Sequence, residues 1–306
     1  MILVCGIPSE QAIAMVLEQL YNIGAPHVVF NQRQFASAKL EFKISRGQIS
    51  GFLQLRGSKL RLEDVQSVYT RMMDFRYLPE IRDEPADSQR RLYCQALHNT
   101  IMHWFQIAQA RVISRPSILG SNFSKPYQVQ LIQEQGFNVP ETLITNDPSL
   151  VLQFYENHDR VIYKSISSVR SIVQTLKETD LERLDHIRWC PTQFQSYIKG
   201  SNVRVHVVGR KTFATIVNTD ATDYRYAYQV GGHTNLKAFE LPNALAEKCV
   251  KLSYALGLEV SGIDLKITPD NQVYCFEVNP SPAFGYYENS TGQPIALAIA
   301  QYLADV

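Results

Sequence analysis

The most informative part of the sequence reads Val260-Ser-Gly-Ile-Asp-Leu-Lys-Ile-Thr-Pro-Asp-Asn-Gln-Val-Tyr-Cys-Phe-Glu-Val-Asn-Pro280. Two runs rich in apolar and β-branched residues flank the turn-forming residues Thr-Pro-Asp-Asn. Such a pattern is typical of a strand, a tight turn and a second strand. The simplest hairpin has Asp270-Asn271 as a two-residue loop.

The predicted hairpin brings two acidic side chains together. With that loop, Pro269 faces Gln272, and continuing the count places Asp264 opposite Glu277. Asn279 follows two residues later and projects from the same face as Glu277. Carboxylates at roughly 5 Å repel each other unless a positive charge lies between them. Two carboxylates and an amide oxygen are ligands that suit Mg²⁺. The alternative is a surface hairpin whose acidic side chains simply face water.

The length and charge of the chain exclude some classes of protein. At roughly 150 residues per domain, 306 residues predict about two domains or three small ones. The 30 Lys and Arg residues nearly balance 29 Asp and Glu, which disfavours a general nucleic-acid partner and a polybasic membrane surface. No apolar run approaches the roughly 20 residues of a membrane span, so we expect no membrane association.

The compartment is also suggested by the sequence. The first ten residues lack the basic leader and long apolar region of a secretion signal. Five scattered cysteines without a Cys-x-x-Cys pair argue against a disulfide framework and a zinc ribbon. Both observations favour a cytoplasmic protein.

The remaining pattern has an α/β start and an antiparallel later half, an α+β class overall. Ser9 is a suitable cap for the first helix, and Gly24 a suitable stop. A run of turn residues predicts a boundary near residue 115. Strands are predicted at 2–5, 28–30, 51–55, 59–62, 161–164, 193–198, 203–208 and 211–217. Further helices are predicted at about 88–108, 126–136, from 148, at 243–256 and at 293–303.

Two segments of the hairpin carry a family resemblance. Gly262-Ile-Asp264 and Phe276-Glu-Val-Asn-Pro-Ser-Pro282 look like the metal-binding hairpin of the ATP-grasp ligases, in particular their RimK-like branch. The resemblance implies that Asp264, Glu277 and Asn279 hold Mg²⁺ or Mn²⁺ at the phosphates of ATP. It also implies three parts, with the nucleotide between two α+β subdomains. We expect an N-terminal domain at 1–115, a central lid at 116–195 and a C-terminal subdomain at 196–306.

Other positions match the family in the order that it requires. Lys125 and Lys164 resemble its two nucleotide-contacting lysines, and Gln195-Ser196-Tyr197-Ile198 resembles the hinge strand that recognises adenine. Asn202 and Arg204 look like the polar pair after the hinge, and Arg225 like a phosphate-binding arginine. The resemblance implies nucleotide binding by Lys125, Lys164, residues 195–198 and Asn202, and catalytic roles for Arg204 and Arg225.

Two departures point to a sub-branch. The segment 165–171, where the family has a glycine-rich lid, contains no glycine, and Ser196 and Asn202 replace common acids. Val68-Tyr-Thr-Arg-Met-Met-Asp-Phe-Arg76 is similar to the Val-Trp-x-Arg-Arg pattern of microviridin-type graspetide ligases, which also lack that lid. Arg71 and Arg76 are then expected to line an acceptor-side cleft, with ordinary surface charges as the alternative.

The resemblance implies an ATP-dependent carboxylate–amine or carboxylate–hydroxyl ligase that forms an acylphosphate. The expected substrate is a peptide or protein side chain. A small-molecule amino-acid ligase of glutathione-synthetase type is the alternative, as is an ATP-binding module without turnover. If the resemblance does not hold, the remaining hypothesis is an ordinary α+β binding domain. The expected partners are ATP and the peptide or amino-acid substrate, and a homodimer is left open.

Overall fold

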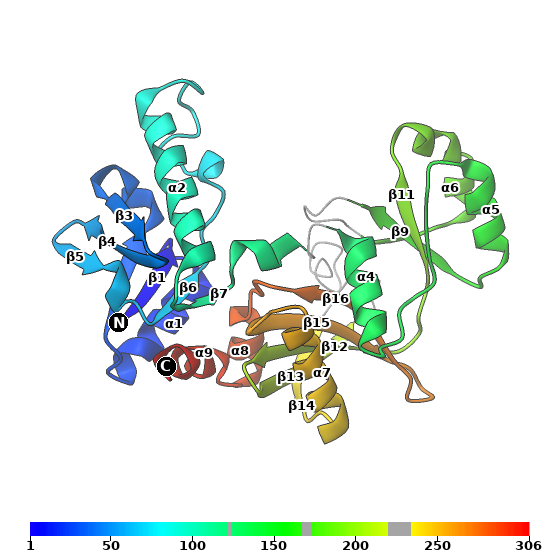
Figure 1. The fold of residues 1–306 in the computed structure, drawn as a ribbon. Coiled ribbons are helices and arrows are strands. Elements are labelled where there is room, and N and C mark those ends of the chain that lie inside the picture. Colours follow the sequence, from blue (N-terminus) through cyan, green and yellow to red (C-terminus); the bar gives the residue numbers. More distant parts are fainter. Residues whose placement is uncertain (121–123, 167–172, 220–233, 306) are drawn as a thin grey trace.

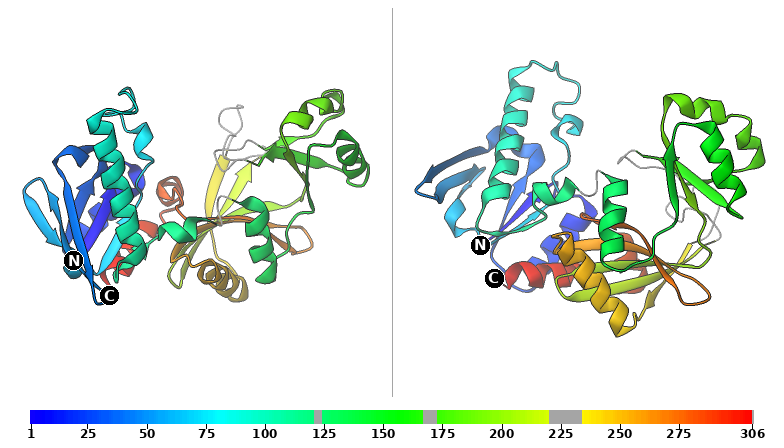
Figure 2. Two further views of the ribbon diagram at one scale, coloured as in Figure 1. Left: turned by 45° about the horizontal axis from the view of Figure 1, so that its top comes forward. Right: turned by 45° about the vertical axis from the view of Figure 1, so that its right-hand side comes forward.

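A computed structural model describes residues 1–120, 124–166, 173–219 and 234–305 of the chain. Three parts follow one another in space (Figure 1): an N-terminal part, a central sheet built from the last third of the chain, and an outer lid. Two further views show the same order (Figure 2). The predicted α+β class with an α/β N-terminal part is confirmed.

The N-terminal part is built on a parallel sheet of order β2-β1-β6-β7. A second, antiparallel sheet of order β3-β4-β5 lies beside it. The elements are β1 (Ile2–Gly6), α1 (Gln11–Asn22), β2 (His27–Asn31), η1 (Gln32–Ser37), β3 (Lys39–Ser45), β4 (Gln48–Leu55), β5 (Ser58–Arg61), η2 (Leu62–Asp64), β6 (Ser67–Thr70), η3 (Phe75–Tyr77), α2 (Gln89–Ile107) and β7 (Arg111–Ile113). Every residue of β1 is buried, as expected for a parallel strand covered on both faces.

One predicted cap in this part is wrong. The cap of α1 is Glu10, whose carboxylate accepts a hydrogen bond from the Ile13 N–H at 3.0 Å, and not Ser9. The longer acidic side chain can reach the first turn from one position later. Gly24 does follow the helix end, with a φ of +66° that glycine adopts without strain.

The lid is a small antiparallel sheet of order β10-β9-β11-β8. Its elements are β8 (Thr142–Thr145), α5 (Pro148–Glu156), β9 (Val161–Ser165), β10 (Gln174–Thr175), α6 (Glu178–Leu181), η5 (Leu184–Trp189) and β11 (Thr192–Ser196). Phe194 of β11 packs with Val151 and Phe154 of α5 in a separate core. The alternate residues Gln193 and Gln195 therefore lie on the other face of the sheet.

The central sheet is antiparallel, with the order β14-β13-β12-β15-β16. Its elements, with the segments that lead to it, are η4 (Pro116–Leu119), α4 (Lys125–Glu134), β12 (Ser201–Val208), β13 (Lys211–Thr219), β14 (Thr234–Phe239), α7 (Asn243–Ala255), β15 (Val260–Ile267), β16 (Val273–Asn279), α8 (Gly285–Thr291) and α9 (Ile295–Ala304). Helices α4 and α7 cover one face, where Ile132 and Leu252 join the core. Helix α9 instead packs against α1, so the two ends of the chain share one core.

The register of the β15–β16 hairpin differs from the simple count near its turn. Thr268, not Pro269, pairs with Gln272, and its N–H donates to the Gln272 carbonyl at 3.0 Å. Proline cannot fill this place because it has no N–H to donate. The loop thus contains three residues, and a bulge between Asp264 and Leu265 leaves Phe276 without a partner. The bulge restores the predicted pairing of Asp264 with Glu277.

Among the described residues, none of the helices combines the length and apolar character that a membrane span requires.

Candidate active site

The two hairpin acids lie opposite each other, and each is paired with a cation. Arg204 Nη1 donates to Asp264 Oδ1 at 2.8 Å, and Lys125 Nζ lies 3.0 Å from Glu277 Oε1. All four side chains are at most 22% exposed, so water screens these pairs only partly. The expected repulsion between the carboxylates is therefore offset from two sides.

The position of Lys125 depends on a clamp between α4 and the edge strand β16. Gln128 is buried and bonds both backbone groups of Val278: its Nε2 donates to the carbonyl at 2.8 Å and its Oε1 accepts from the N–H at 3.0 Å. Lys125 lies three residues before Gln128, on the same side of the helix. The side chain of Lys125 is consequently directed at Glu277, next to Val278. Gln128 has no counterpart in the sequence-based prediction.

The position of Arg204 follows from the sheet. Arg204 of β12 is the register partner of Asp264 of β15, so both side chains rise from the same face. At Gly262, a side chain would clash with the Arg204 guanidinium. Glycine in the Gly-Ile-Asp segment thus leaves room for the arginine over the sheet.

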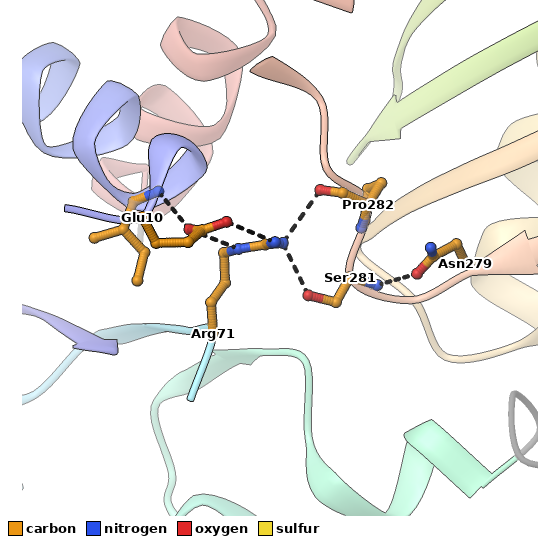
Figure 3. A network of polar contacts seen from close by, with 6 residues as sticks. Glu10, Arg71, Asn279, Ser281 and Pro282 are labelled. Carbon is orange, nitrogen blue, oxygen red and sulfur yellow. Dashed lines mark hydrogen bonds and ion pairs between the residues drawn. The ribbon is translucent and has the colours of Figure 1, made fainter. Parts of the chain in front are cut away.

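Asn279 ends the hairpin and is held by a network that reaches the N-terminal part (Figure 3). Its Oδ1 accepts from the Ser281 N–H at 2.9 Å. Arg71 Nη1 donates to Ser281 Oγ at 2.9 Å and to the Pro282 carbonyl at 3.1 Å. The same guanidinium is bidentate to Glu10, at 3.1 and 3.0 Å. Arg71 therefore ties the segment after Asn279 to the end of β6 and the start of α1.

Arg76, which was expected beside Arg71, lies elsewhere. Its exposed side chain pairs with Asp74 on the surface, so the plain alternative of a surface charge holds for this residue.

An open pocket lies between the lid sheet and the central sheet, with about 740 Å³ of empty space including its mouth. Most of the predicted nucleotide residues line it, together with both hairpin acids. The lining residues are Ile162, Lys164, Val173, Gln195, Tyr197, Ile198, Asn202, Val203, Asp264, Leu265, Lys266, Phe276 and Glu277. Ser196 does not line the pocket: its hydroxyl accepts from the Glu141 N–H at 3.1 Å, joining β11 to the segment before β8.

Gln195 provides an acceptor at the hinge end of this pocket. Its side chain is buried, and Nε2 donates to Thr142 Oγ1 at 2.9 Å. Within the described part of the chain, Oε1 has no hydrogen-bond partner. A buried acceptor without a donor is costly, and a ligand with an amino group would satisfy it.

Lys266 is a pocket residue that the sequence reasoning missed. It is 8% exposed, and its ammonium lies 5.0 Å from the ring centroid of Tyr197 and 5.7 Å from that of Phe276. Burial, with a smaller effect of Arg160, lowers the pKa of the Lys266 ammonium. The available signal was its spacing: Lys266 follows Asp264 by two residues on a strand.

The described residues contain no group of three or more His, Cys, Asp or Glu side chains that could hold a metal ion. The hairpin contributes two carboxylates, of Asp264 and Glu277, and the amide of Asn279. Arg225 and most of the glycine-free segment (residues 167–171) lie outside the described residues.

Comparison with known proteins places this geometry in a family. A sequence model of the RimK-like ATP-grasp domain matches residues 124–303, more than half of the chain. A probable alpha-L-glutamate ligase from Cellvibrio japonicus is 25% identical over 225 residues, covering 67% of this chain and 71% of that protein. Another from Pasteurella multocida is 27% identical over 198 residues, covering 64% and 57%.

Solved structures share the fold over the whole chain. The macrocyclase MdnC from Microcystis aeruginosa, bound with the precursor peptide MdnA, matches with a TM-score of 0.82 and 23% identity over 100% of this chain and 99% of that one. A RiPP-associated ATP-grasp ligase from Chryseobacterium gregarium, in complex with ADP and a leader and core peptide, matches with 0.82 and 23% over 99% and 96%. The ATP-grasp ligase PsnB, complexed with a precursor variant, Mg and ADP, matches with 0.79 and 23% over 99% and 97%.

Proposed function

This chain belongs to the RimK-like ATP-grasp family of ATP-dependent ligases, and on that premise we propose that it joins a carboxylate of a peptide or protein to an amine or hydroxyl. The observation that carries the proposal is the pairing of Asp264 with Glu277 beside an interdomain pocket. Each acid has a cation within 3.0 Å, and both line the pocket that contains the hinge residues.

The donor set fits a divalent cation. Asp264 and Glu277 supply two carboxylates from facing strands, and the Asn279 oxygen keeps a second lone pair beside its bond to Ser281. Such hard oxygen donors, few in number, are typical of Mg²⁺ sites that are completed by substrate phosphates. Mg²⁺, or Mn²⁺ as the alternative, would neutralise phosphate charge when bound between these residues.

The pocket also fits the nucleotide. Apolar side chains such as Ile162, Leu265 and Phe276 can enclose a base, and the buried Oε1 of Gln195 offers an acceptor for an exocyclic amino group. Lys164 lines the same pocket from β9, and Lys125 approaches from α4. We assign both lysines to the phosphates, and Tyr197, Ile198 and Asn202 to the base and ribose end.

The protein residues have separate tasks in the reaction. Transfer of a phosphoryl group from ATP to the substrate carboxylate gives an acylphosphate and ADP. Attack by the amine or hydroxyl gives a tetrahedral intermediate, and phosphate leaves. Arg204, fixed over the sheet by Asp264, lies where a cation can stabilise the charge on these oxygens. We assign the same task to Arg225.

A peptide or protein substrate is supported by the relatives of known structure. The macrocyclase and the RiPP-associated ligase match this chain over nearly its full length, N-terminal part included, and their structures contain peptides. The curated relatives are described as probable alpha-L-glutamate ligases, and we therefore include free glutamate among the candidate acceptors.

The test is turnover with candidate substrates. Purified protein with ATP and Mg²⁺ is incubated with peptides rich in Asp, Glu, Ser, Thr and Lys, with and without free glutamate, and ADP and product masses are followed. Loss of water from a peptide indicates an internal bond, and gain of a glutamyl unit indicates glutamate ligation. Turnover only with free amino acids would contradict the proposed substrate class. ATP binding without turnover for every acceptor would contradict the ligase.

A further inference from the structure

Lys266 is a largely buried lysine that the reaction described above does not use. It lies on β15, across from Asn202 of β12 and Tyr274 of β16. The residue is 8% exposed and lines the pocket. Over the described ranges of the chain, no carboxylate or carbonyl group pairs with its Nζ.

Arg160 adds a second positive charge to the surroundings of Lys266. The Arg160 guanidinium lies 3.9 Å from the Tyr197 ring centroid, and the Lys266 ammonium 5.0 Å from the same centroid. Cation–π contacts with Tyr197 and Phe276 replace only part of the hydration that burial removes. A ligand atom with a lone pair in this pocket would supply the missing acceptor.

Gln195 adds a hydrogen-bond acceptor to the pocket that Lys266 lines. Among the described residues, its buried Oε1 has no hydrogen-bond donor and the Lys266 ammonium has no acceptor, and both side chains line one pocket. Adenine carries a donor and acceptors close together, because ring nitrogens flank its amino group. Guanine carries the O6 acceptor where adenine has the amino donor, and O6 would face the Gln195 oxygen unfavourably.

We propose that Lys266 helps to bind the adenine base by donating a hydrogen bond to one of the two ring nitrogens that flank its amino group. The inference rests on the proposed use of ATP and deepens it, because it assigns a residue to the base. Tyr197 and Phe276 lie beside the ammonium, which donates to the base from the central sheet. Gln195 reads the amino group from the lid sheet.

Calorimetry with nucleotide analogues tests this role. Mg²⁺–ATP, 7-deaza-ATP and 1-deaza-ATP, each lacking one ring nitrogen, are titrated into the wild-type protein, Lys266→Met and Lys266→Arg. Lys199→Met is the matched control, because Lys199 is exposed and lies next to the hinge outside the pocket lining. Thermal melts of each variant verify that it is folded.

Lys266→Met is expected to weaken ATP binding about tenfold, the effect of one hydrogen bond from a charged donor. Lys266→Arg should retain part of the affinity, and Lys199→Met all of it. Wild type should lose a similar factor with one of the deaza analogues, whereas Lys266→Met should not distinguish that analogue from ATP. In turnover, the variant should raise KM for ATP and leave kcat unchanged.

Equal ATP affinity of wild type and Lys266→Met would overturn the inference, as would an equal loss for the variant with every analogue. Either result leaves the proposed function intact if wild type binds Mg²⁺–ATP. Failure of the wild-type protein to bind ATP would instead overturn the proposed function and this inference together.

Discussion

The hairpin end of the pocket and its hinge end differ in how their polar groups are partnered. At the hairpin end, Asp264 and Glu277 are paired with Arg204 and Lys125 at 2.8 and 3.0 Å. At the hinge end, the buried Gln195 Oε1 has no partner in the described structure. A ligand that binds at the hairpin end must therefore displace existing ion pairs. At the hinge end it only has to supply a hydrogen-bond donor that is missing. Changes at the hairpin should affect chemistry, and changes at the hinge should affect affinity.

The largest effect is expected from the hairpin acids. Asp264→Asn or Glu277→Gln should lower kcat by at least about 10³-fold, because either change removes a metal-binding charge and leaves a cation without its partner. ADP release at saturating ATP measures the effect. Asp270→Asn, in the exposed turn of the same hairpin, is the control and should be neutral. Near-normal turnover of either variant would contradict the claim that the hairpin acids act in the chemical reaction.

Lys125→Met sharpens the comparison, because this ion pair competes with a metal for Glu277. We expect kcat/KM to fall about 10²-fold through loss of a phosphate-binding cation. The Mg²⁺ concentration for half-maximal binding should nevertheless decrease, because Glu277 no longer has an internal counter-charge. Titration of the variant with Mg²⁺ at fixed ATP measures both. An unchanged or higher Mg²⁺ requirement would show that the pair does not compete.

Arg71→Met tests whether the hairpin end depends on the N-terminal part. Loss of the bonds to Ser281 and Pro282 should loosen the segment that holds Asn279 and weaken Mg²⁺ binding about tenfold. Nucleotide binding without metal should not change. Arg76→Met, in a surface pair with Asp74, is the matched control. If both variants behave alike, the network has no positioning role.

The smallest effect is expected at the hinge. Gln195→Leu should weaken ATP binding about fivefold, the loss of one neutral hydrogen bond. The Tm of the protein without ligand should change little, because the variant loses both the Nε2–Thr142 hydrogen bond and a buried acceptor that has no partner among the described residues. Thermal melts with and without ATP give both values. An unchanged stabilisation by ATP would show that the Gln195 side chain does not contact the nucleotide.

The sequence predicted the hairpin end better than the hinge end, for a physical reason. Residue types and alternation at Asp264 and Glu277 indicated facing carboxylates, and the structure confirms their pairing. The simple residue count from a two-residue loop nevertheless gave the right pairing only because two deviations from it cancel. The three-residue loop shifts the register by one, and the bulge at Phe276 shifts it back. A strand count from sequence includes neither, since both depend on how the backbone packs.

The residues that were missed act through contacts between distant segments. Gln128 clamps α4 to β16, and no local pattern marks a glutamine as a clamp. The residues next to Lys266 in the sequence are apolar, and this pattern is equally compatible with a lysine whose ammonium extends into solvent. The predicted elements were mostly confirmed, but β3 was missed although Leu40, Phe42 and Ile44 alternate with polar residues in Lys39–Ser45. The strands β6, β7, β8 and β14 were missed as well.

The central claim is that Asp264 and Glu277 hold a divalent cation together with the phosphates of ATP. Calorimetric titration of ATP, with and without Mg²⁺, into wild type and the double variant Asp264→Asn, Glu277→Gln tests it most directly. We expect Mg²⁺ to strengthen ATP binding to wild type and to have no effect on the variant, which retains weak binding through the hinge. The same gain in affinity on adding Mg²⁺ to both proteins would contradict the account.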